Sequence, residues 1–254
     1  MKMDYDLTLL LLIFMRMSGC IMFNPILGRK NLPIIIKVGL TLMLSIFCYN
    51  LVPEQNIEIT SFIVLFVTLI KELLIGFMVG YVIQLFLSIL IISGENMDMN
   101  IGISMSKIYD PQSNISMPLS ASLINVMLIF IFFAVNGHLT LIQIFTKLCT
   151  FLPYGNLSFN PNMFQELTSM FSLILIYAVK MSLPVLAAEL ITEIGVGLIM
   201  RAVPQIDVFV INIQFKVILG FLILMVMIPP LASFLEKLIV LMFDNINKVF
   251  LMLK

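Results

Sequence analysis

Apolar residues along the chain gather into six long runs separated by short polar connections. The runs cover residues 7–27, 34–52, 59–93, 119–151, 167–200 and 208–243. A helix needs about 20 residues to cross a bilayer, so the first two runs fit one crossing each. The other four hold 33 to 36 residues and are too long for an upright crossing. We expect these four to tilt, kink or extend beyond the bilayer.

Prolines inside two of these runs predict bends. Pro184 interrupts the fifth run and Pro229-Pro230 the sixth, and a proline within a helix removes a backbone hydrogen bond. No internal repeat, heptad pattern or low-complexity linker divides the chain. The pattern therefore predicts an all-α integral membrane protein, with about six long, partly kinked helices in a single membrane domain over residues 1–254.

The charges in the connections predict an orientation, because lysine and arginine mark cytoplasmic loops. The connection at 28–37 carries three basic residues and that at 201–216 carries two, whereas 53–58 holds only acidic ones. We therefore expect the first, third and fifth connections, which are 28–37, 94–118 and 201–216, to face the cytoplasm. Both termini should then lie outside. The C-terminal end opposes this for the last crossing, because it carries Lys237, Lys248 and Lys254.

The composition places most of the chain in a membrane. Sixty-one per cent of the residues are apolar, 11% are charged, and the mean hydropathy is +1.13. Soluble domains have roughly 45–50% apolar and 25% charged residues, so a soluble enzyme is excluded, as is a disordered chain. Acidic and basic residues balance at 14 each, and without a basic run there is no footprint for nucleic acid.

No catalytic or cofactor-binding pattern is present. The sequence has no P-loop and a single histidine, His138, beside the turn-forming pair Asn136-Gly137. Cys20, Cys48 and Cys149 lie in apolar stretches, as buried small side chains do. We expect no enzyme, no metal site and no cofactor.

Charged residues inside the apolar runs are costly and therefore candidates for function. The ones that we single out are Arg16, Glu72, Lys180, Glu189 and Glu193. Glu189 and Glu193 are four residues apart and share one helix face. A proton-coupled transporter could use them as a relay. We favour a structural interpretation, in which Glu189 and Glu193 pair inside a helical assembly with Arg16, Lys180 or a partner subunit.

The connection at 104–118 is small, polar and bounded by proline, and lies between two long apolar runs. Irregular backbone at membrane depth requires surrounding protein or a water-filled cavity. One interpretation is a pore loop or channel plug, and the other is an ordinary cytoplasmic connector. Under the first interpretation the plug residues are Ser104, Met105, Ser106, Lys107, Tyr109, Asp110, Pro111, Met117 and Pro118.

A second polar stretch, 201–209, joins the last two runs by a tight turn. Such a short connection predicts an antiparallel helical hairpin. Its tip suits a partner-docking surface made of Arg201, Pro204, Gln205, Ile206 and Asp207. The same residues also fit two helix ends, with Arg201 complementing the dipole of one helix and Asp207 serving as N-cap of the next.

Short motifs follow one another in a characteristic order over nearly the whole chain. They are Arg16, Gly19, Pro25, Pro33 and Lys37; Lys71-Glu72 with Gly76 and Gly80; Gly94-Glu95 and Gly102; Asp110-Pro111 and Pro118; Asn136-Gly137-His138; Leu152-Pro153 and Gly155; and Pro204-Gln205-Ile206-Asp207-Val208-Phe209 with Lys216 and Gly220. In order and spacing they resemble the FliR/SctT (SpaR/YscT) family of type III protein export gates. Three features depart from the family pattern: Asp98, Asp207 and the segment 212–215.

This resemblance implies a non-enzymatic subunit of a flagellar export gate in the bacterial inner membrane, at the flagellar basal body. The implied partners are FliP-like, FliQ-like, FlhB-like and FlhA-like proteins, and the cargo is unfolded flagellar protein. The resemblance also implies a FliP-like part over 1–150, a FliQ-like hairpin over 151–254 and a plug at 104–118. An injectisome gate is the alternative within the family, and the proton-coupled transporter is the alternative outside it.

Overall fold

The computed structural model describes residues 7–29, 31–53, 61–104, 108–110, 115–155, 163–202 and 208–252. In these ranges the chain forms seven helices and one two-stranded ribbon. In chain order they are α1 (Leu7–Met22), α2 (Ile34–Tyr49), α3 (Phe62–Ile101), β1 (Ile108–Asp110), β2 (Ile115–Met117), α4 (Leu119–Ala134), α5 (Gly137–Phe151), α6 (Met163–Ala202) and α7 (Val208–Met252).

The predicted all-α membrane class is confirmed, although the number of helices differs from six. The fourth apolar run, 119–151, is divided into α4 and α5, which meet at an angle of 70°. Asn136 lies at this break with a positive φ of 57°, a conformation that asparagine adopts more readily than most residues. The following Gly137 lies against the ring of Phe132, where a Cβ would clash.

Three described helices, α3, α6 and α7, are long and apolar enough to cross a membrane, and the bent pair α4–α5 would make a fourth span. The chain is therefore a multi-pass membrane protein. Helices α1 and α2 hold 16 residues each, about 24 Å at 1.5 Å per residue. Both are shorter than the hydrocarbon core of about 30 Å, so an upright crossing by each, as the apolar runs predicted, does not fit.

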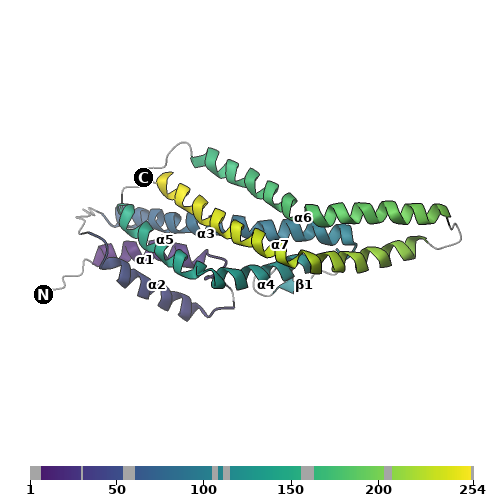
Figure 1. Ribbon diagram of the computed structural model, residues 1–254. Helices are drawn as coiled ribbons and strands as arrows, with labels where there is room; N and C mark the ends of the chain where they lie inside the picture. The colour runs from purple at the N-terminus through teal and green to yellow at the C-terminus, as the bar shows by residue number, and fades with distance from the viewer. Residues whose placement is uncertain are drawn as a thin grey trace.

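The predicted bends are present in α6 and α7. Helix α6 stays helical through Pro184, and α7 through Pro229 and Pro230. Figure 1 shows that each helix changes direction about half-way along, and by residue number the prolines fall near the middle of each helix. The cause is local, because each proline ring displaces the preceding turn and leaves one carbonyl without its helical donor.

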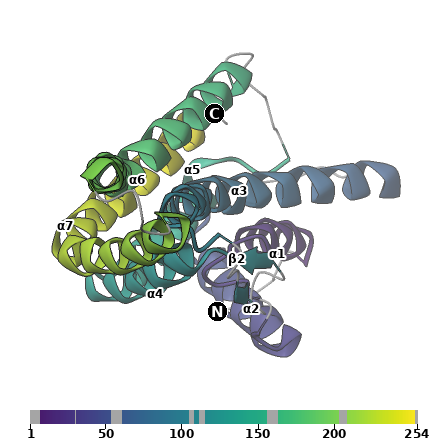
Figure 2. The ribbon, with the colours of Figure 1, turned by 90° about the vertical axis from the view of Figure 1, so that its right-hand side faces the viewer.

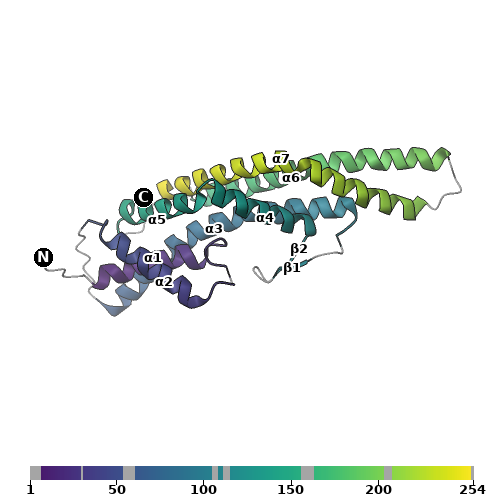
Figure 3. The same ribbon diagram turned by 60° about the horizontal axis from the view of Figure 1, so that its bottom comes forward.

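Helix α3 lies at the centre of the molecule. It contacts α1, α4, α6 and α7, and the end view in Figure 2 shows it between the α1–α2 pair and the α6–α7 hairpin. Figures 1 and 3 show that α1, α3 and α6 run in one direction and α2, α4–α5 and α7 return. The start of α1 and the end of α7 consequently lie toward the same end of the molecule.

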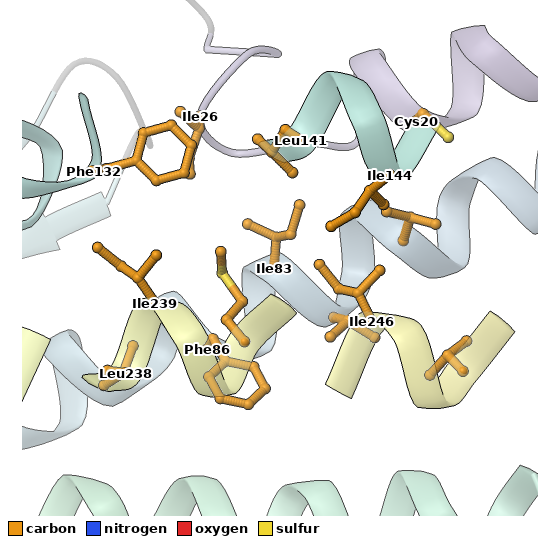
Figure 4. Packing of buried hydrophobic residues seen from close by; sticks show 14 of the residues in the cluster. Cys20, Ile26, Ile83, Phe86, Phe132, Leu141, Ile144, Leu238, Ile239 and Ile246 are labelled. Atoms are coloured by element: carbon orange, nitrogen blue, oxygen red, sulfur yellow. The ribbon is translucent and has the colours of Figure 1, made fainter. Parts of the chain in front are cut away.

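The core consists of the helix faces turned toward α3. Figure 4 shows Ile83 and Phe86 of α3 in one cluster with Leu141 of α5 and with Leu238 and Ile246 of α7, and all five side chains are almost fully buried. The hairpin is much less covered. Half of the most apolar stretch of α3 is buried within the chain, against 33% for α6 and 17% for α7. The outer faces of the hairpin are therefore left for lipid or partner helices.

The alternation of helix direction makes the predicted orientation testable. Single cysteines at Arg29 and Arg201 should resist an impermeant thiol reagent in intact cells, because basic connections stay in the cytoplasm. Cysteines at Glu54 and Asn156 should react unless a partner covers them. The native cysteines are buried and add little background. Labelling at Arg29 from outside would reverse the orientation.

Candidate functional site

The most deeply buried polar cluster joins α1 to α3. Arg16 is fully buried and Glu72 is 1% exposed. The Nε and Nη2 atoms of Arg16 each lie 2.6 Å from Oε2 of Glu72. Two buried opposite charges in an apolar interior stabilise each other only if their remaining polar atoms also find partners.

Those remaining partners come from the end of α5. Nη1 of Arg16 donates to the carbonyl oxygens of Leu148 and Leu152, each at 2.9 Å, and Nη2 donates to that of Pro153 at 3.4 Å. The last carbonyls of a helix have no helical donor, and a cation is favourable at this negative end of the helix dipole. Arg16 therefore caps α5 and pairs with Glu72 at the same time.

The segment after α5 completes the cluster. The backbone N–H of Gly155 donates to Oε1 of Glu72 at 3.0 Å, and the ring of Tyr154 lies 3.8 Å from the guanidinium carbon of Arg16. Burial raises the pKa of Tyr154, so its phenol is neutral, and the contact with Arg16 is one of cation and aromatic ring. This cluster, Arg16–Glu72–α5, links three segments that are far apart in the sequence.

Glycines explain why α1 and α3 approach closely enough for this pairing. Glu72, Gly76 and Gly80 recur every four residues and share one face of α3. A Cβ on Gly76 would come within 2.2 Å of the Arg16 carbonyl oxygen, and one on Gly80 within 2.7 Å of Phe23. Small residues at such spacing allow helix backbones to touch, which brings Arg16 within reach of Glu72.

A second buried carboxylate, Asp98, lies near the C-terminal end of α3 and is 2% exposed. It accepts hydrogen bonds from the backbone N–H of Ser120, at 3.2 Å to Oδ1, and from the Ser120 hydroxyl. Ser120 is in the first turn of α4. The Asp98 carboxylate therefore caps α4 from a neighbouring helix. From the sequence, Asp98 was noted only as a residue that departs from the family pattern.

The connection between α3 and α4 is a short antiparallel ribbon. Ile108, Tyr109 and Asp110 of β1 pair with Met117, Ser116 and Ile115 of β2. The expectation of irregular backbone at this place is wrong for these residues, because the two strands satisfy each other's backbone groups. Figure 3 shows the ribbon beside α4, near the end of α3.

The described ribbon residues include only part of the predicted plug. Ser104 is half-buried before the ribbon, and Met117 and Pro118 are buried where the chain enters α4. The backbones of Tyr109 and Asp110 form β1. Met105, Ser106, Lys107 and Pro111 lie outside the described residues, and the role of the whole set as a plug stays a prediction.

The charged residues of α6 do not pair with Arg16 or Lys180 as expected. Glu193 pairs with Lys216 of α7 rather than with Arg16 or Lys180, because the antiparallel hairpin sets these two positions opposite each other. Glu189, one turn earlier, is 2% exposed and neither of its carboxylate oxygens has a hydrogen-bond partner. Lys180 is exposed on the outer face of α6, 5.4 Å from the ring centroid of Tyr177.

The hairpin tip is only partly described. Arg201 is exposed in the last turn of α6, where a basic side chain complements the helix dipole. Pro204, Gln205, Ile206 and Asp207 lie outside the described residues. Docking by this tip stays a prediction.

Comparison with known proteins identifies the family. Residues 7–242 match the family described as bacterial export proteins, family 1. That match runs from the start of α1 into the last turns of α7. The chain belongs to this export family.

Relatives in this family include both flagellar and injectisome proteins. The flagellar biosynthetic protein FliR of Escherichia coli is 29% identical over 88% of this chain and 85% of its own length. FliR of Bacillus subtilis is 27% identical over 85% of this chain and 84% of its own length. The Yop proteins translocation protein T of Yersinia pestis is 26% identical over 93% of this chain and 92% of its own length.

Among the described residues, no group of three or more histidine, cysteine or acidic side chains is arranged to hold a metal ion. Three of their buried charged side chains join helices, Arg16 with Glu72 and Asp98 with α4, whereas the buried Glu189 has no hydrogen-bond partner. Sequence reasoning singled out Arg16 and Glu72, but it expected Arg16 to face Glu189 or Glu193 and gave Glu72 no partner. In the structure Arg16 pairs with Glu72, and the spacing of Glu72, Gly76 and Gly80 was a signal for this helix contact.

Proposed function

We propose that the chain is a subunit of the flagellar type III protein export gate, and that it forms part of the channel through which unfolded flagellar proteins cross the bacterial inner membrane. The observation that carries this proposal is the family match over residues 7–242. Relatives named as flagellar biosynthetic proteins cover most of the chain and support the flagellar form of the gate.

The distribution of apolar surface supports assembly with other chains. On α7 the exposed large side chains include Ile218, Leu222, Met225 and Val226, and α6 has a similar outer face. FliP-like, FliQ-like, FlhB-like and FlhA-like proteins are the proposed partners. We infer that residues 1–150, which end at the last turn of α5, pack as a FliP-like subunit, and that 151–254 pack as a FliQ-like hairpin.

We propose a structural role rather than an enzymatic one. The buried polar groups Arg16, Glu72 and Asp98 are engaged with helix ends, which leaves them unsuited to act on a substrate. A subunit of this kind needs no cofactor of its own, because it supplies a path and a closure for the exported chain. We infer that the ribbon segment, 104–118, is that closure.

Deleting the gene and restoring it on a plasmid tests the proposed function. The deletion strain should be non-motile and should secrete no flagellar hook or filament protein, and the full chain should restore both. An otherwise motile deletion strain that fails to secrete injectisome substrates would instead support the injectisome alternative, for which the Yersinia relative speaks.

The transporter alternative makes a different prediction for Glu189. We expect Glu189→Gln to leave secretion unchanged, because neither carboxylate oxygen has a hydrogen-bond partner to lose and a buried amide costs less than a buried charge. Secretion and motility are measured beside Glu193→Gln, which loses an exposed ion pair worth at most about 1 kcal/mol. Loss of secretion by Glu189→Gln in a fully assembled complex would favour the proton relay.

The hairpin tip is proposed to dock a FlhB-like partner through Gln205, Ile206 and Asp207. Asp207→Lys should weaken this association, because it reverses the charge at the interface. Placing like charges opposite each other at a desolvated interface costs several kcal/mol of binding free energy. Recovery of the FlhB-like chain with a tagged subunit measures the effect, and Asp207→Asn serves as the milder control. Equal recovery with Asp207→Lys and with the parent would count against docking at this tip.

A further inference from the structure

The second half of α6 carries two carboxylates that share one lysine of α7. Glu189 and Glu193 lie one turn apart on the same face of α6, and Lys216 is paired with Glu193. In the described part of the chain, neither carboxylate oxygen of Glu189 and not the buried Oδ1 of Asn212, one turn before Lys216, has a hydrogen-bond donor. Lys216 and Glu193 both act electrostatically on Glu189. The contact between α6 and α7 is therefore short of positive charge and of donors.

Water offsets this imbalance only as long as Glu193 stays exposed. Its side chain is 49% exposed, and its exposed neighbours on this side of α6, Leu190 and Ile194, are large and apolar. Such a surface in a membrane protein is covered by lipid or by another helix. Once it is covered, Glu193 loses its water, and a buried charge is tolerated only when a second charge pairs with it.

A glycine one turn after Glu193 favours a helix over lipid. A Cβ on Gly197 would meet no atom of the described chain within 4 Å, and small residues allow helix backbones to approach each other. Helix α3 has the same spacing in Glu72 and Gly76. There α1 lies against the glycine, and its Arg16 pairs with the glutamate. Helix α6 thus repeats the spacing of α3, with the place that α1 takes left open among the described residues.

We propose that this side of α6 docks a helix of a partner subunit, whose lysine or arginine pairs with Glu193. The surface, called the Glu193 face, consists of Leu190, Glu193, Ile194 and Gly197. The proposal rests on the proposed function, because the partner is another chain of the export complex, and it adds the chemistry of the contact. The docked segment is an apolar helix with a basic residue, and its backbone passes close to Gly197. Lys216 and the partner's basic residue together balance the two carboxylates of α6.

Release of partners from the purified complex tests the charge. The complex is isolated through a tag on the full chain, and the FliP-like and FliQ-like chains that stay bound are followed over time after dilution. Glu193→Lys should release one of them at least about ten times faster than the parent, because like charges repel at a covered interface. Glu193→Lys combined with Lys216→Glu keeps an ion pair between α6 and α7 but still presents a positive charge to the partner. This charge swap should release the partner as fast as Glu193→Lys does, and it carries the test if the single variant does not fold.

Two glycine variants test the close approach of the partner helix. Gly197→Leu should also speed release, because the added side chain fills the space that the partner backbone takes. Gly195→Leu is the matched control, since a Cβ there likewise meets no atom of the described chain within 4 Å but residue 195 lies off the Glu193 face. It should release the partner at the parental rate.

A photo-reactive amino acid at Leu190 identifies what lies on the Glu193 face. Leu190 is exposed and lies one turn before Glu193, so the captured peptide of a partner chain should be apolar and carry a lysine or arginine within about two turns of the cross-link. Capture of lipid, or of a peptide without a basic residue, overturns the proposal.

The release rates separate this proposal from the proposed function. Faster release by Glu193→Lys, by the charge swap and by Gly197→Leu, with Gly195→Leu unchanged, supports the docking of a basic helix. Parental release by Glu193→Lys, recovery by the charge swap, or equal effects of the two glycine variants overturns it, while the partners recovered with the parent leave the proposed function standing. A parent chain that brings no such partners overturns both.

Discussion

Arg16→Met should destabilise the protein more than any other single substitution that we propose. It leaves Glu72 as a buried charge without its partner and the last carbonyls of α5 without a donor. Removing one member of a buried ion pair costs about 3–5 kcal/mol, which is a large share of the stability of a typical domain. We expect little or no folded chain in the membrane, measured as the amount recovered in the assembled complex and as a lower midpoint of thermal unfolding.

Two further variants separate charge from general damage. Lys71→Gln changes the neighbouring half-buried charge, which lies outside the cluster, and should fold as the parent does. Arg16→Met combined with Glu72→Leu removes the unpaired charge and should recover part of the lost stability, although the end of α5 stays uncapped. An Arg16→Met chain with parental abundance and unfolding midpoint would contradict the structural role of the cluster.

Shortening the ribbon segment between Ser106 and Ser116 should leave assembly intact and increase ion leak. A plug must exclude small ions yet give way to a polypeptide, and a ribbon joined to fixed helices at both ends can be displaced without unfolding them. Methionine side chains such as Met117 are flexible enough to form such a seal. The measurement is membrane conductance, with secretion of flagellar protein followed in the same strains.

A matched control removes residues from 156–162 only, between Gly155 and the start of α6, and the ribbon segment is shortened by the same number. The contacts of Leu152, Pro153 and Gly155 with Arg16 and Glu72 are then retained. That variant should assemble and leak no more than the parent. If the shortened ribbon also assembles and conducts as the parent does, the segment is only a connector between α3 and α4.

The helices could be predicted from the sequence because their signal is local. Runs of apolar residues gave the membrane class, and prolines in the fifth and sixth runs gave the bends. The division of the fourth run at Asn136 was harder to predict, because the apolar pattern continues through it and only the pair Asn136-Gly137 interrupts it. The ribbon was missed because its strands are three residues long, too short for a period of two to be recognised.

The contacts of the site depend on residues far apart in the chain and could not be read from spacing. Arg16 meets Glu72 across 56 positions and the end of α5 across more than 130. In the sequence, Asp98 was only a residue that departs from the family pattern. Its partner Ser120 lies 22 positions later, at the start of α4, and only the fold brings the two together. Composition could identify these residues as costly inside apolar runs, but only the tertiary fold supplies their partners.

Copurification tests the central claim most directly. A tagged full-length chain, expressed at its native level and extracted gently from membranes, should bring FliP-like and FliQ-like chains with it in a fixed ratio that is unchanged between preparations and across the peak of a sizing column. Because the outer faces of α6 and α7 are apolar and uncovered within the chain, these partners should stay bound after the lipid is removed. A chain that elutes alone, or with these proteins in variable amounts, would contradict its assignment as a subunit of the export gate.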